Sequence, residues 1–564
     1  MKHTQIILIA IVVLAAILRL TALGKIPAGF TPDEASQGYT AYSLLKTGRD
    51  EWGVYMPIAS FRSFLDYKAP LQTYLMVPSV ALFGLNEFAV RLPSAIMGIL
   101  SILVLYQLIM TLGTKFLIEE DRRIVDALAI LAAGTLAISP WHLQFSRMAL
   151  EASTATFLIL TGLWLFIKGL NSPKYWLGSG VAFGFSMYAY HSAKIFVPLI
   201  LVALAWLFAK SIKSRKTWIC LILPLFILLI PLVLDTLFGQ GGTRGADLLI
   251  SSLNDLEVKS ILDQRFYSPL SRISPVLPAI FHNKLTFIAD KFIENYFSYF
   301  NLSFWFVEGG REITYSIIPG RGLLYTWLVI PLLAGIVFLI IHYRQKKLAL
   351  LILIWLLLAA VPAAITKEGY RPNRASPYLG LLEIIIAFGG YYLWRLAGKH
   401  RHLMAGIGVI LAVISLGFYL DDYAFAGQVK YPDSMAYGWR EAAAFIKANG
   451  DRYESVYVQK AGQPQAMIAF YFEIPPEDFQ KESIAWAQDA KQQKVTYLDQ
   501  LGSYQLGRFR FEPLNFPEDI KPNTLYLSSG PFELLPQNRN TLHTVLSGAD
   551  RPQLELFTFT EINR

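Results

Sequence analysis

Cysteine and charge are both scarce in this sequence of 564 residues. The single cysteine, Cys220, lies within an apolar run, which excludes a disulfide framework and a cysteine metal cluster. Charged residues make up 16% of the chain, against about 25% in ordinary globular domains. No internal repeat is visible, which disfavours a transporter built from duplicated halves. This composition argues against a soluble enzyme.

Long apolar runs take the place of the missing charge, and 54% of the residues are hydrophobic. A run of about 20 apolar residues crosses a bilayer core of about 30 Å. The chain is therefore expected to be a polytopic α-helical membrane protein with about eleven transmembrane helices. The shorter run 70–84, interrupted by Pro78, predicts a helix at the membrane interface. The predicted spans lie near 5–24, 88–112, 124–142, 152–168, 175–190, 195–210, 217–236, 321–342, 348–366, 375–395 and 402–420.

Basic residues between these spans set the expected orientation. Lys115, Lys174, Lys210 and Arg395 fall in connections on the same side as the N-terminus. The positive-inside rule then places the N-terminus in the cytoplasm of a plasma-membrane protein. The first run is expected to be an uncleaved anchor, because many more runs follow it. The net charge of +9 is thus a topology signal, and no nucleic-acid partner is expected.

Two regions are predicted from these features: a membrane domain over 1–420 and an extracytoplasmic α/β domain over 421–564. The membrane domain carries a first outer loop at 25–87 and a long outer loop at 237–320, and a loop of that length is usually functional. Within the long loop, spaced aromatics over 281–306 favour helices at the membrane surface. In the last region, 434–450 predicts a helix ending at Gly450, and 465–473 predicts a helix or a strand. Strands are predicted at 453–459, 495–501, 523–529 and 554–561.

The stretch "TPDEAS" after the first span has two interpretations. Thr31 fits an N-cap, Pro32 the first helical position, and Glu34 the third position of a capping box. Alternatively, Asp33 and Glu34 form a catalytic carboxylate pair. The sequence chemistry of this stretch leaves both open.

Further polar residues are expected on the same outer face as this pair. Cations near a carboxylate base suit the attack of a hydroxyl or an amine on a phosphate-activated donor, because they stabilise the departing phosphate. Each residue also has a structural explanation, such as a lysine at lipid headgroups, an arginine and Glu151 paired along a helix, or, for Arg91, an anchor at the second span. The candidates are Lys68, Arg371 and Arg374 for a phosphate, with Arg147, His191 and Lys194 as further polar residues.

The order of these motifs resembles the GT-C fold glycosyltransferases. "TPDEASQGYTAYSLLKTG" is followed by "LDYKAPLQTYLMVPSVALFGLNEFAVRLPSAIMGIL", and later by "HLQFSRMALEAS", "NYFSYFNLSFWFVEGG" and "YRPNRASPYLG". The likeness is to the branch of protein O-mannosyltransferases and the lipid A aminoarabinose transferase, and it covers roughly 5–420. Such enzymes transfer a sugar from a polyprenyl-phosphate carrier to an acceptor outside the cytoplasm, with inversion at the anomeric carbon.

The resemblance implies a role for each matching residue. Asp33 becomes the base with Glu34 as its companion, and Lys68 the lysine near the donor phosphate. Arg371 and Arg374 match the phosphate-binding loop more loosely. The lipid A branch often has an acid directly before the lysine, where this chain has Tyr67 with Asp66 one further back, so a second catalytic acid is left open.

No cofactor and no catalytic metal are expected, since the first outer loop holds no Asp-x-Asp motif. The expected partners are a polyprenyl-phosphate-linked sugar, membrane lipids, and an acceptor that is a protein, a lipid or a glycan. Two alternatives remain: a ligase or polymerase of polyprenyl-diphosphate glycans, and a transporter. The transporter is disfavoured because the spans are nearly free of charge at their centres. The capping box accounts for Glu34 and does not require Asp33. Glu34→Gln is therefore expected to reduce activity less than Asp33→Asn does.

Overall fold

The computed structural model describes residues 2–116, 122–212, 215–239, 248–311, 318, 320–343, 346–516 and 520–559. Parts of the long loop predicted at 237–320 and the end of the strand predicted at 554–561 thus lie outside the described residues. Contacts divide the chain into two compact units. Unit 1 comprises Met1–Ile11, Ser101–Trp141 and Ala155–Val409, and unit 2 comprises Val12–Leu100, His142–Thr154 and Ile410–Arg564.

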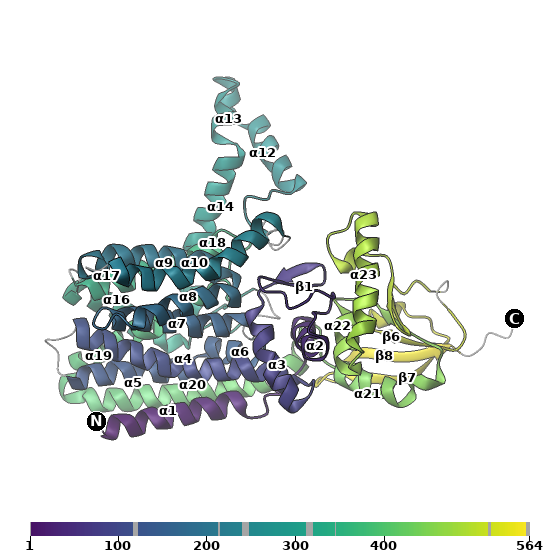
Figure 1. Cartoon of the computed structure of the whole chain (residues 1–564), viewed down its shortest axis with the longest axis horizontal. Helices are drawn as coiled ribbons and strands as arrows, with labels where there is room; N and C mark the ends of the chain where they lie inside the picture. The colour runs from purple at the N-terminus through teal and green to yellow at the C-terminus, as the bar shows by residue number, and fades with distance from the viewer. Residues whose placement is uncertain are drawn as a thin grey trace. The chain divides into compact units, whose positions relative to one another are not determined.

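Unit 1 is a bundle of long apolar helices that lie side by side (Figure 1). Apolar helices satisfy every backbone group internally, as a bilayer requires. Gly335 and Gly389 allow two of them, α16 and α19, to touch: a Cβ on Gly389 would lie 1.7 Å from the Pro331 carbonyl oxygen. The helices are α5 (Arg122–Ile138), α8 (Tyr175–Ala189), α9 (His191–Phe208), α10 (Arg215–Phe238), α12 (Asp255–Tyr267), α13 (Leu277–Phe281), α14 (Lys284–Ser298), α15 (Leu302–Phe306), α16 (Val329–Tyr343), α17 (Lys347–Ala359), α18 (Val361–Ala364) and α19 (Leu381–Leu396).

Each of the eleven predicted spans coincides with a described helix. Within the described residues, eight helices are long and apolar enough to cross a membrane. The pair α5 and α6 (Pro140–Arg147), bent by 57°, raises the number to nine if it is one span. At about 1.5 Å per residue, α8 and α16 are too short for a bilayer core, with 15 residues each. The multi-pass membrane protein expected from the sequence is confirmed, whereas the count of eleven and the orientation stay predictions.

Unit 2 contains the first loop of the chain and its C-terminal sheet. The interfacial segment predicted at 70–84 is a helix of 13 residues. The elements of this part, including helices that supply residues to both units, are α1 (Lys2–Leu20), α2 (Pro32–Thr47), β1 (Phe61–Ser63), β2 (Asp66–Lys68), α3 (Leu71–Phe83), α4 (Glu87–Phe116), α6 (Pro140–Arg147), α7 (Glu151–Gly169) and α20 (Arg401–Val429).

The C-terminal part is an α/β domain, as predicted. Its six-stranded sheet has the order β4-β5-β3-β6-β8-β7, in which β3 runs parallel to β5 and β6 and the other pairs are antiparallel. Alternation along β3 places Val456 and Val458 in the core under the helices and Tyr457 on the opposite face. The elements are α21 (Trp439–Asn449), β3 (Ser455–Gln459), α22 (Pro464–Phe472), α23 (Pro476–Gln493), β4 (Tyr504–Leu506), β5 (Phe509–Glu512), β6 (Thr524–Ser528), β7 (Arg539–Leu546) and β8 (Pro552–Phe559).

The predicted helix ending at Gly450 is confirmed, and the ambiguous segment 465–473 is helical. The strand predicted at 495–501 is wrong. Gln500 Oε1 accepts the N–H groups of Thr496 and Tyr497 at 2.8 and 3.0 Å, which closes a 3-10 turn over Leu498–Gln500. The boundary predicted at residue 421 lies inside α20.

Helices of the C-terminal domain pack directly on α2. The Tyr39 hydroxyl donates to the Ile474 carbonyl at 2.8 Å, and the rings of Phe30 and Phe470 have centroids 4.7 Å apart. Gln480 on α23 donates to the Ser43 hydroxyl at 3.1 Å. The first loop and the C-terminal domain thus share one core, which fixes α2 on one side.

Candidate active site

Helix α2 begins as the sequence predicts. Thr31 is the N-cap, and its side chain accepts the Glu34 N–H at 3.3 Å. Glu34 Oε2 accepts the Thr31 N–H in return at 3.2 Å. The capping box fixes the first turn, so Asp33 lies at the positive end of the helix dipole.

Glu34 is buried in an ion pair that the sequence did not indicate. Arg91 donates from Nε to Glu34 Oε1 at 2.8 Å and from Nη2 to Glu34 Oε2 at 3.1 Å. The Ala149 N–H adds a bond to Oε1 at 3.2 Å. Both charged side chains are almost fully buried. Arg91 also donates to the carbonyls of Pro27 and Gly29, so the pair ties the start of α4 to α2 and to the chain before it.

Lys68 comes from a two-stranded hairpin whose tight turn is Phe64 and Leu65. Ser63 pairs with Asp66, and Phe61 with Lys68. Both turn residues have positive φ, at 56° and 68°, which is the type I′ geometry that fits two-residue hairpins. The turn costs strain for residues other than glycine, and it brings the Phe64 ring to 4.9 Å from Lys68 Nζ.

The structure brings Asp33 and Lys68 together as an ion pair between Lys68 Nζ and Asp33 Oδ1. The Lys68 side chain is 7% exposed and the Asp33 side chain 28% exposed. A buried cation and a helix N-terminus both favour the ionised form of the Asp33 carboxyl. The carboxylate is therefore held in one place and keeps partial access to solvent.

A second acidic pair, Asp50 and Glu51, lies buried in the same loop and was missed from the sequence. Glu51 Oε1 accepts the Ser36 hydroxyl at 3.1 Å, and the hydroxyl oxygens of Ser36 and Ser63 are 2.8 Å apart. Burial raises the pKa of Glu51 to about 8 and that of Asp50 to about 6. The stretch "RDEWG" repeats the Asp-Glu pattern, but this pattern does not tell a buried acid pair from an exposed one.

Glu51 therefore keeps its proton near neutral pH, and its hydrogen-bond partner Ser36 lies one turn of α2 after Asp33. Ser36 connects the two, since it lies three residues after Asp33 on the same helix face. Next to Ser36 on that face, Gln37 donates to Glu151 Oε1 at 3.1 Å. This face of α2 is thus lined by acids and their hydrogen-bond donors.

Three other predicted residues of unit 2 have structural partners. Arg147 donates to the Leu18 carbonyl and, at 2.8 and 2.9 Å, to the carbonyls of Thr21 and Ile26. It thereby satisfies carbonyl groups at and beyond the end of α1. Asp66 Oδ1 accepts the Tyr67 N–H at 2.8 Å, which places both residues at the turn end of β2.

The remaining predicted residues belong to unit 1. Arg371 pairs with Glu368, and its N–H donates to the Tyr299 hydroxyl at 3.1 Å. Arg374 follows in the same turn. His191 and Lys194 lie in the first turn of α9. Hydroxyls of Ser192 and Ser376 that are 3.3 Å apart bring this turn next to the segment after Arg374.

The geometry assembles chemistry for proton and charge transfer. It supplies a fixed carboxylate at Asp33, a buried cation at Lys68 and a protonated acid at Glu51. Within the described part of the chain, no group of three or more His, Cys, Asp and Glu side chains is placed to hold a metal ion.

Part of the chain matches a known family. A family model described as dolichyl-phosphate-mannose-protein mannosyltransferase matches residues 67–234. This stretch begins next to Lys68 and ends within α10. No curated protein sequence matches the chain.

Solved structures share its fold over nearly the whole length. ArnT from Cupriavidus metallidurans bound to undecaprenyl phosphate aligns with a TM-score of 0.55 at 12% identity, over 97% of each chain. The same protein in the apo state gives 0.51 at 13% identity, again over 97% of each chain. The oligosaccharyltransferase of Archaeoglobus fulgidus gives 0.46 at 14% identity, over 82% of this chain and 61% of that one. The GT-C fold expected from the sequence is confirmed, and the family match agrees with the prediction of a glycosyltransferase.

Proposed function

We propose that this protein is a membrane glycosyltransferase that transfers a sugar from a polyprenyl-phosphate carrier to an acceptor on the outer face of the membrane. The observation that carries the proposal is the ion pair of Asp33 with the buried Lys68. A base and a phosphate-binding cation meet there in a chain with this fold. That an ArnT of the same fold was solved with undecaprenyl phosphate supports a lipid-linked monophosphate as the donor.

In the proposed reaction, Asp33 takes the proton of an acceptor hydroxyl or amine. The acceptor atom attacks the anomeric carbon from the face opposite the phosphate, so the new bond forms with inversion. The bond between that carbon and the phosphate oxygen breaks, and its electron pair leaves with the polyprenyl phosphate. Lys68 stabilises the negative charge that grows on the leaving phosphate.

The ion pair also links the binding of the donor to the position of the Asp33 carboxylate. Asp33 holds the ammonium group of Lys68, and the phosphate of the donor competes for the same group. Donor binding then weakens the hold of Lys68 on Asp33 and turns the carboxylate toward the acceptor. Glu34 takes no part in proton transfer in this scheme, because Arg91, Thr31 and Ala149 occupy its oxygens; it positions the turn that carries Asp33.

Arg371 and Arg374 stay candidates for phosphate binding from the sequence resemblance. Their segment is held by Glu368 and Tyr299, so a role in binding has to be tested by variants of its own. Arg371→Ala and Arg374→Ala are expected to raise KM for the lipid donor with kcat little changed. An unchanged KM in both variants would rule out a role in phosphate binding for these two arginines.

The experiment that tests the proposal measures sugar transfer by the full chain in bilayer nanodiscs. The donor is a radiolabelled polyprenyl-phosphate sugar, and the acceptor is a membrane and envelope extract. Asp33→Asn is expected to lower the rate by about 10²–10⁴-fold, the range for loss of a general base. Transfer at the wild-type rate by Asp33→Asn would overturn the assignment of the base.

A matched control is available in the same chain. Glu477→Gln removes an acid at the same position of another helix start, Pro476-Glu477-Asp478, where the side chain is exposed. This variant is expected to transfer at the wild-type rate. Adding unlabelled polyprenyl-diphosphate glycan decides between donors, since efficient competition by the diphosphate would favour the ligase or polymerase.

A further inference from the structure

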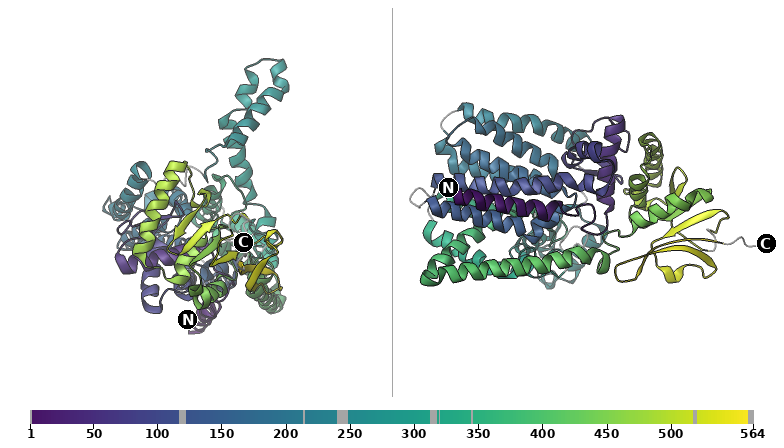
Figure 2. Two further views of the ribbon diagram at one scale, coloured as in Figure 1. Left: turned by 90° about the vertical axis from the view of Figure 1, so that its right-hand side faces the viewer. Right: turned by 90° about the horizontal axis from the view of Figure 1, so that it is seen from below.

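A hairpin of helices projects from unit 1 and exposes large apolar side chains. It comprises α12, α13 and α14, residues 255–298, and is called the projecting hairpin (Figures 1 and 2). Phe266 is 78% exposed, Leu285 75%, Ile273 75% and Phe297 65%. Several large apolar side chains exposed on one segment indicate a contact with a partner or with a membrane.

Four exposed apolar residues of α14 form one stripe. Leu285, Ala289, Ile293 and Phe297 recur every four residues and are all exposed, so they lie along one side of the helix. Asp290 and Glu294 lie on the side next to it, where Lys291 pairs with Glu294 at 2.8 Å. A helix of a soluble protein turns its apolar side to the core, whereas α14 presents this stripe to the surroundings.

The root of α14 fixes the depth at which the hairpin leaves the bundle. The Tyr296 hydroxyl donates to the Leu357 carbonyl at 3.1 Å, and Asn295 Nδ2 donates to the Ala364 carbonyl at 3.3 Å. Leu357 and Ala364 belong to the candidate span Lys347–Ala364. The two residues are seven positions apart, which is about 10 Å along a helix. The last turn of α14 therefore lies beside the end of a membrane span, at the depth where interfacial helices bind.

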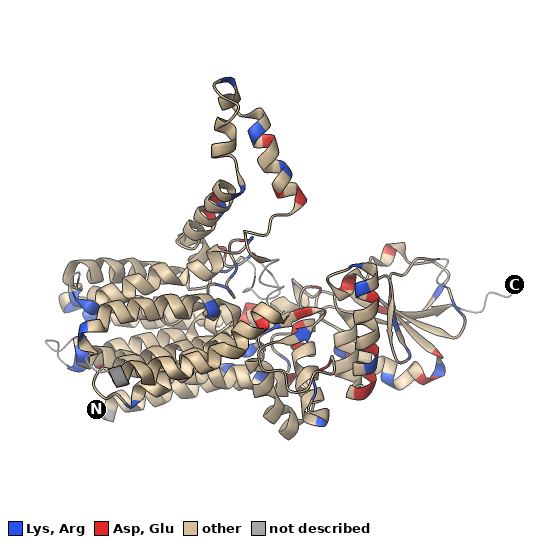
Figure 3. Ribbon diagram, turned by 45° about the horizontal axis from the view of Figure 1, so that its top comes forward, with Lys and Arg blue, Asp and Glu red and all other residues tan. Residues whose placement is uncertain are grey.

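The charge of the projecting hairpin excludes an electrostatic partner. Residues 255–298 hold five acids and five bases, and Figure 3 shows both signs mixed along α12. A polyanion or a strongly basic protein surface would find no complementary field there. The surface that the hairpin contacts must instead bury its apolar side chains and leave its scattered charges solvated at the edge.

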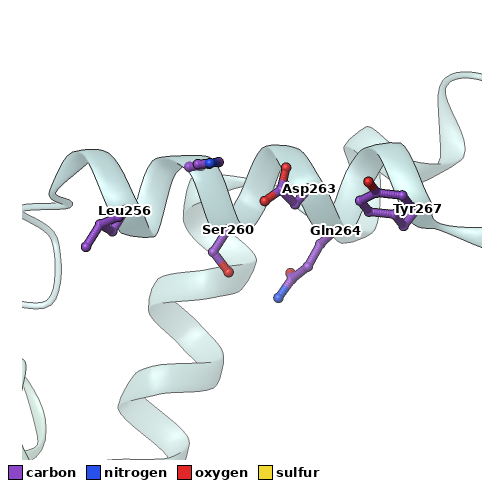
Figure 4. A pocket seen from close by; sticks show the side chains of 6 residues that line it. Leu256, Ser260, Asp263, Gln264 and Tyr267 are labelled. Carbon is purple, nitrogen blue, oxygen red and sulfur yellow. The ribbon is translucent and has the colours of Figure 1, made fainter.

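One face of α12 has the same mixed character. Leu256 and Tyr267 flank Ser260, Asp263 and Gln264 along a hollow in the surface (Figure 4). Polar and charged side chains between two apolar ones fit the boundary between headgroups and acyl chains. They do not fit the hydrocarbon interior, where a charge is costly.

We propose that the projecting hairpin lies in the headgroup–acyl boundary of the phospholipid bilayer, with the stripe Leu285–Ala289–Ile293–Phe297 toward the acyl chains. Attachment is by apolar burial, so it does not require anionic lipid. The hairpin then extends the footprint of the helical bundle along the membrane plane from the end of the span at Ala364.

The single cysteine of the chain makes this testable by spin labelling. In a Cys220→Ser background, nitroxides are placed one at a time through Ile293→Cys and Phe297→Cys on the stripe, and through Asp290→Cys and Glu294→Cys beside it. The full-length protein is reconstituted in phosphatidylcholine nanodiscs, and the collision rates of each label with oxygen and with a water-soluble nickel chelate are compared. All four side chains are exposed, so the labels are expected to leave the fold intact, which gel filtration checks.

The oxygen-to-nickel ratio is expected to be several-fold higher at 293 and 297 than at 290 and 294, because oxygen concentrates in acyl chains and the chelate in water. The same contrast in nanodiscs with and without anionic lipid is expected. Equal access of nickel to all four labels would overturn the proposal, since the stripe would then face water. Low access of both reagents at 293 and 297 would also overturn it, because another protein surface or a second copy would then cover the stripe.

Discussion

Two helices of unit 2 start with nearly the same residues and have different surroundings. Helix α2 begins Pro32-Asp33-Glu34 and helix α23 begins Pro476-Glu477-Asp478. Both acid pairs lie in the first helical turn, where a negative charge is favoured. In α23 the two acids are exposed. In α2, Glu34 is buried against Arg91 and Asp33 pairs with Lys68.

The comparison shows that a helix start becomes a site through its neighbours. The local pattern explains why both pairs are acidic. It does not explain why α2 receives an arginine from α4 and a lysine from the β1–β2 hairpin. Those two cations separate the two acids of α2 into one that holds the structure and one that stays within reach of solvent.

The largest expected effect comes from breaking the Glu34–Arg91 pair. Glu34→Gln leaves the buried guanidinium of Arg91 without its counter-charge, which costs about 3–5 kcal/mol when one partner of such a pair is removed. Thermal unfolding of the purified protein in detergent, followed by tryptophan fluorescence, measures this loss. Asp478→Asn, the corresponding change in α23, is expected to unfold at the same temperature as the wild type. Equal transition temperatures for Glu34→Gln and the wild type would refute the structural role of Glu34.

This result bears on the sequence prediction that Glu34→Gln is milder for activity than Asp33→Asn. In the structure, Glu34→Gln is expected to lower the stability of the folded protein, so activity has to be normalised to the amount of folded protein. Measured in that way, Glu34→Gln is still expected to retain more activity than Asp33→Asn. A loss equal to that of Asp33→Asn per folded molecule would contradict this division between the acids.

The second effect depends on pH and concerns Glu51, a buried acid near the start of α2, whereas the acids at the start of α23 are exposed. The pKa of Glu51 is raised by burial from 4.5 to about 8, so its proton stays bound on folding. Below pH 4.5 the Glu51 carboxyl is protonated in both the folded and the unfolded protein, so the folded protein keeps its full stability. As the pH rises toward 8, the carboxyl ionises in the unfolded protein first, and this part of the stability is lost. The loss is on the order of a few kcal/mol. Glu51→Gln does not lose it.

The difference in melting temperature between Glu51→Gln and the wild type is therefore expected to grow in favour of the variant from pH 5 to pH 8. Melting curves across this range measure it. Glu477→Gln serves as the control, because it makes the same change at an exposed side chain. A difference that is constant with pH would show that Glu51 is ionised in the folded protein.

The third effect concerns the cation that only the α2 start receives. Lys68→Met keeps the length of the side chain and removes its charge, so in the proposed reaction the leaving phosphate would lose its stabilising partner. Transfer is expected to fall by about 10²–10³-fold, the range for the loss of one charge-stabilising donor. Lys68→Arg is expected to recover part of the rate. If Lys68→Met transfers sugar as fast as the wild type, Lys68 only anchors Asp33.

The smallest effect separates the caps of the two helices. Thr31→Ala removes the side-chain cap of α2 and is expected to cost about 1 kcal/mol of stability. Helix α23 has Pro475 at the N-cap, without a side-chain hydrogen bond, so Pro475→Ala is expected to change stability less. Chemical denaturation of the two variants in detergent measures the difference. A larger loss for Pro475→Ala would show that the cap is not what distinguishes the helices.

Local features of the fold were predictable from the sequence because neighbouring residues determine them. The capping box of Thr31 and Glu34, the helix ending at Gly450 and the strand at β3 follow from spacing and period. The strand predicted at 495–501 failed because the Gln500 side chain bonds to nearby backbone N–H groups and closes a turn. Such a local hydrogen bond competes with a strand, and β-propensity does not register it.

The site was predictable only in part. Asp33 and Lys68 came from the order of motifs, and the structure brings them together. The acid Glu51 was missed, because nothing in its local sequence tells a buried acid from an exposed one. The partner of Glu34 was also missed: Arg91 lies 57 residues further along the chain, and no periodicity links the two positions.

The sequence by itself determined the membrane character, the GT-C pattern and the start of α2, since each depends on apolar run length, motif order or contacts within one turn. Only the tertiary structure decided that Glu34 is a buried structural acid, that Asp33 faces a lysine, and that Glu51 keeps its proton. The reason is physical: the energy of a charge depends on burial and on partners from distant segments. The two Pro-acid-acid helix starts differ in their caps, which are local, and in burial and distant partners, which only the tertiary structure supplies.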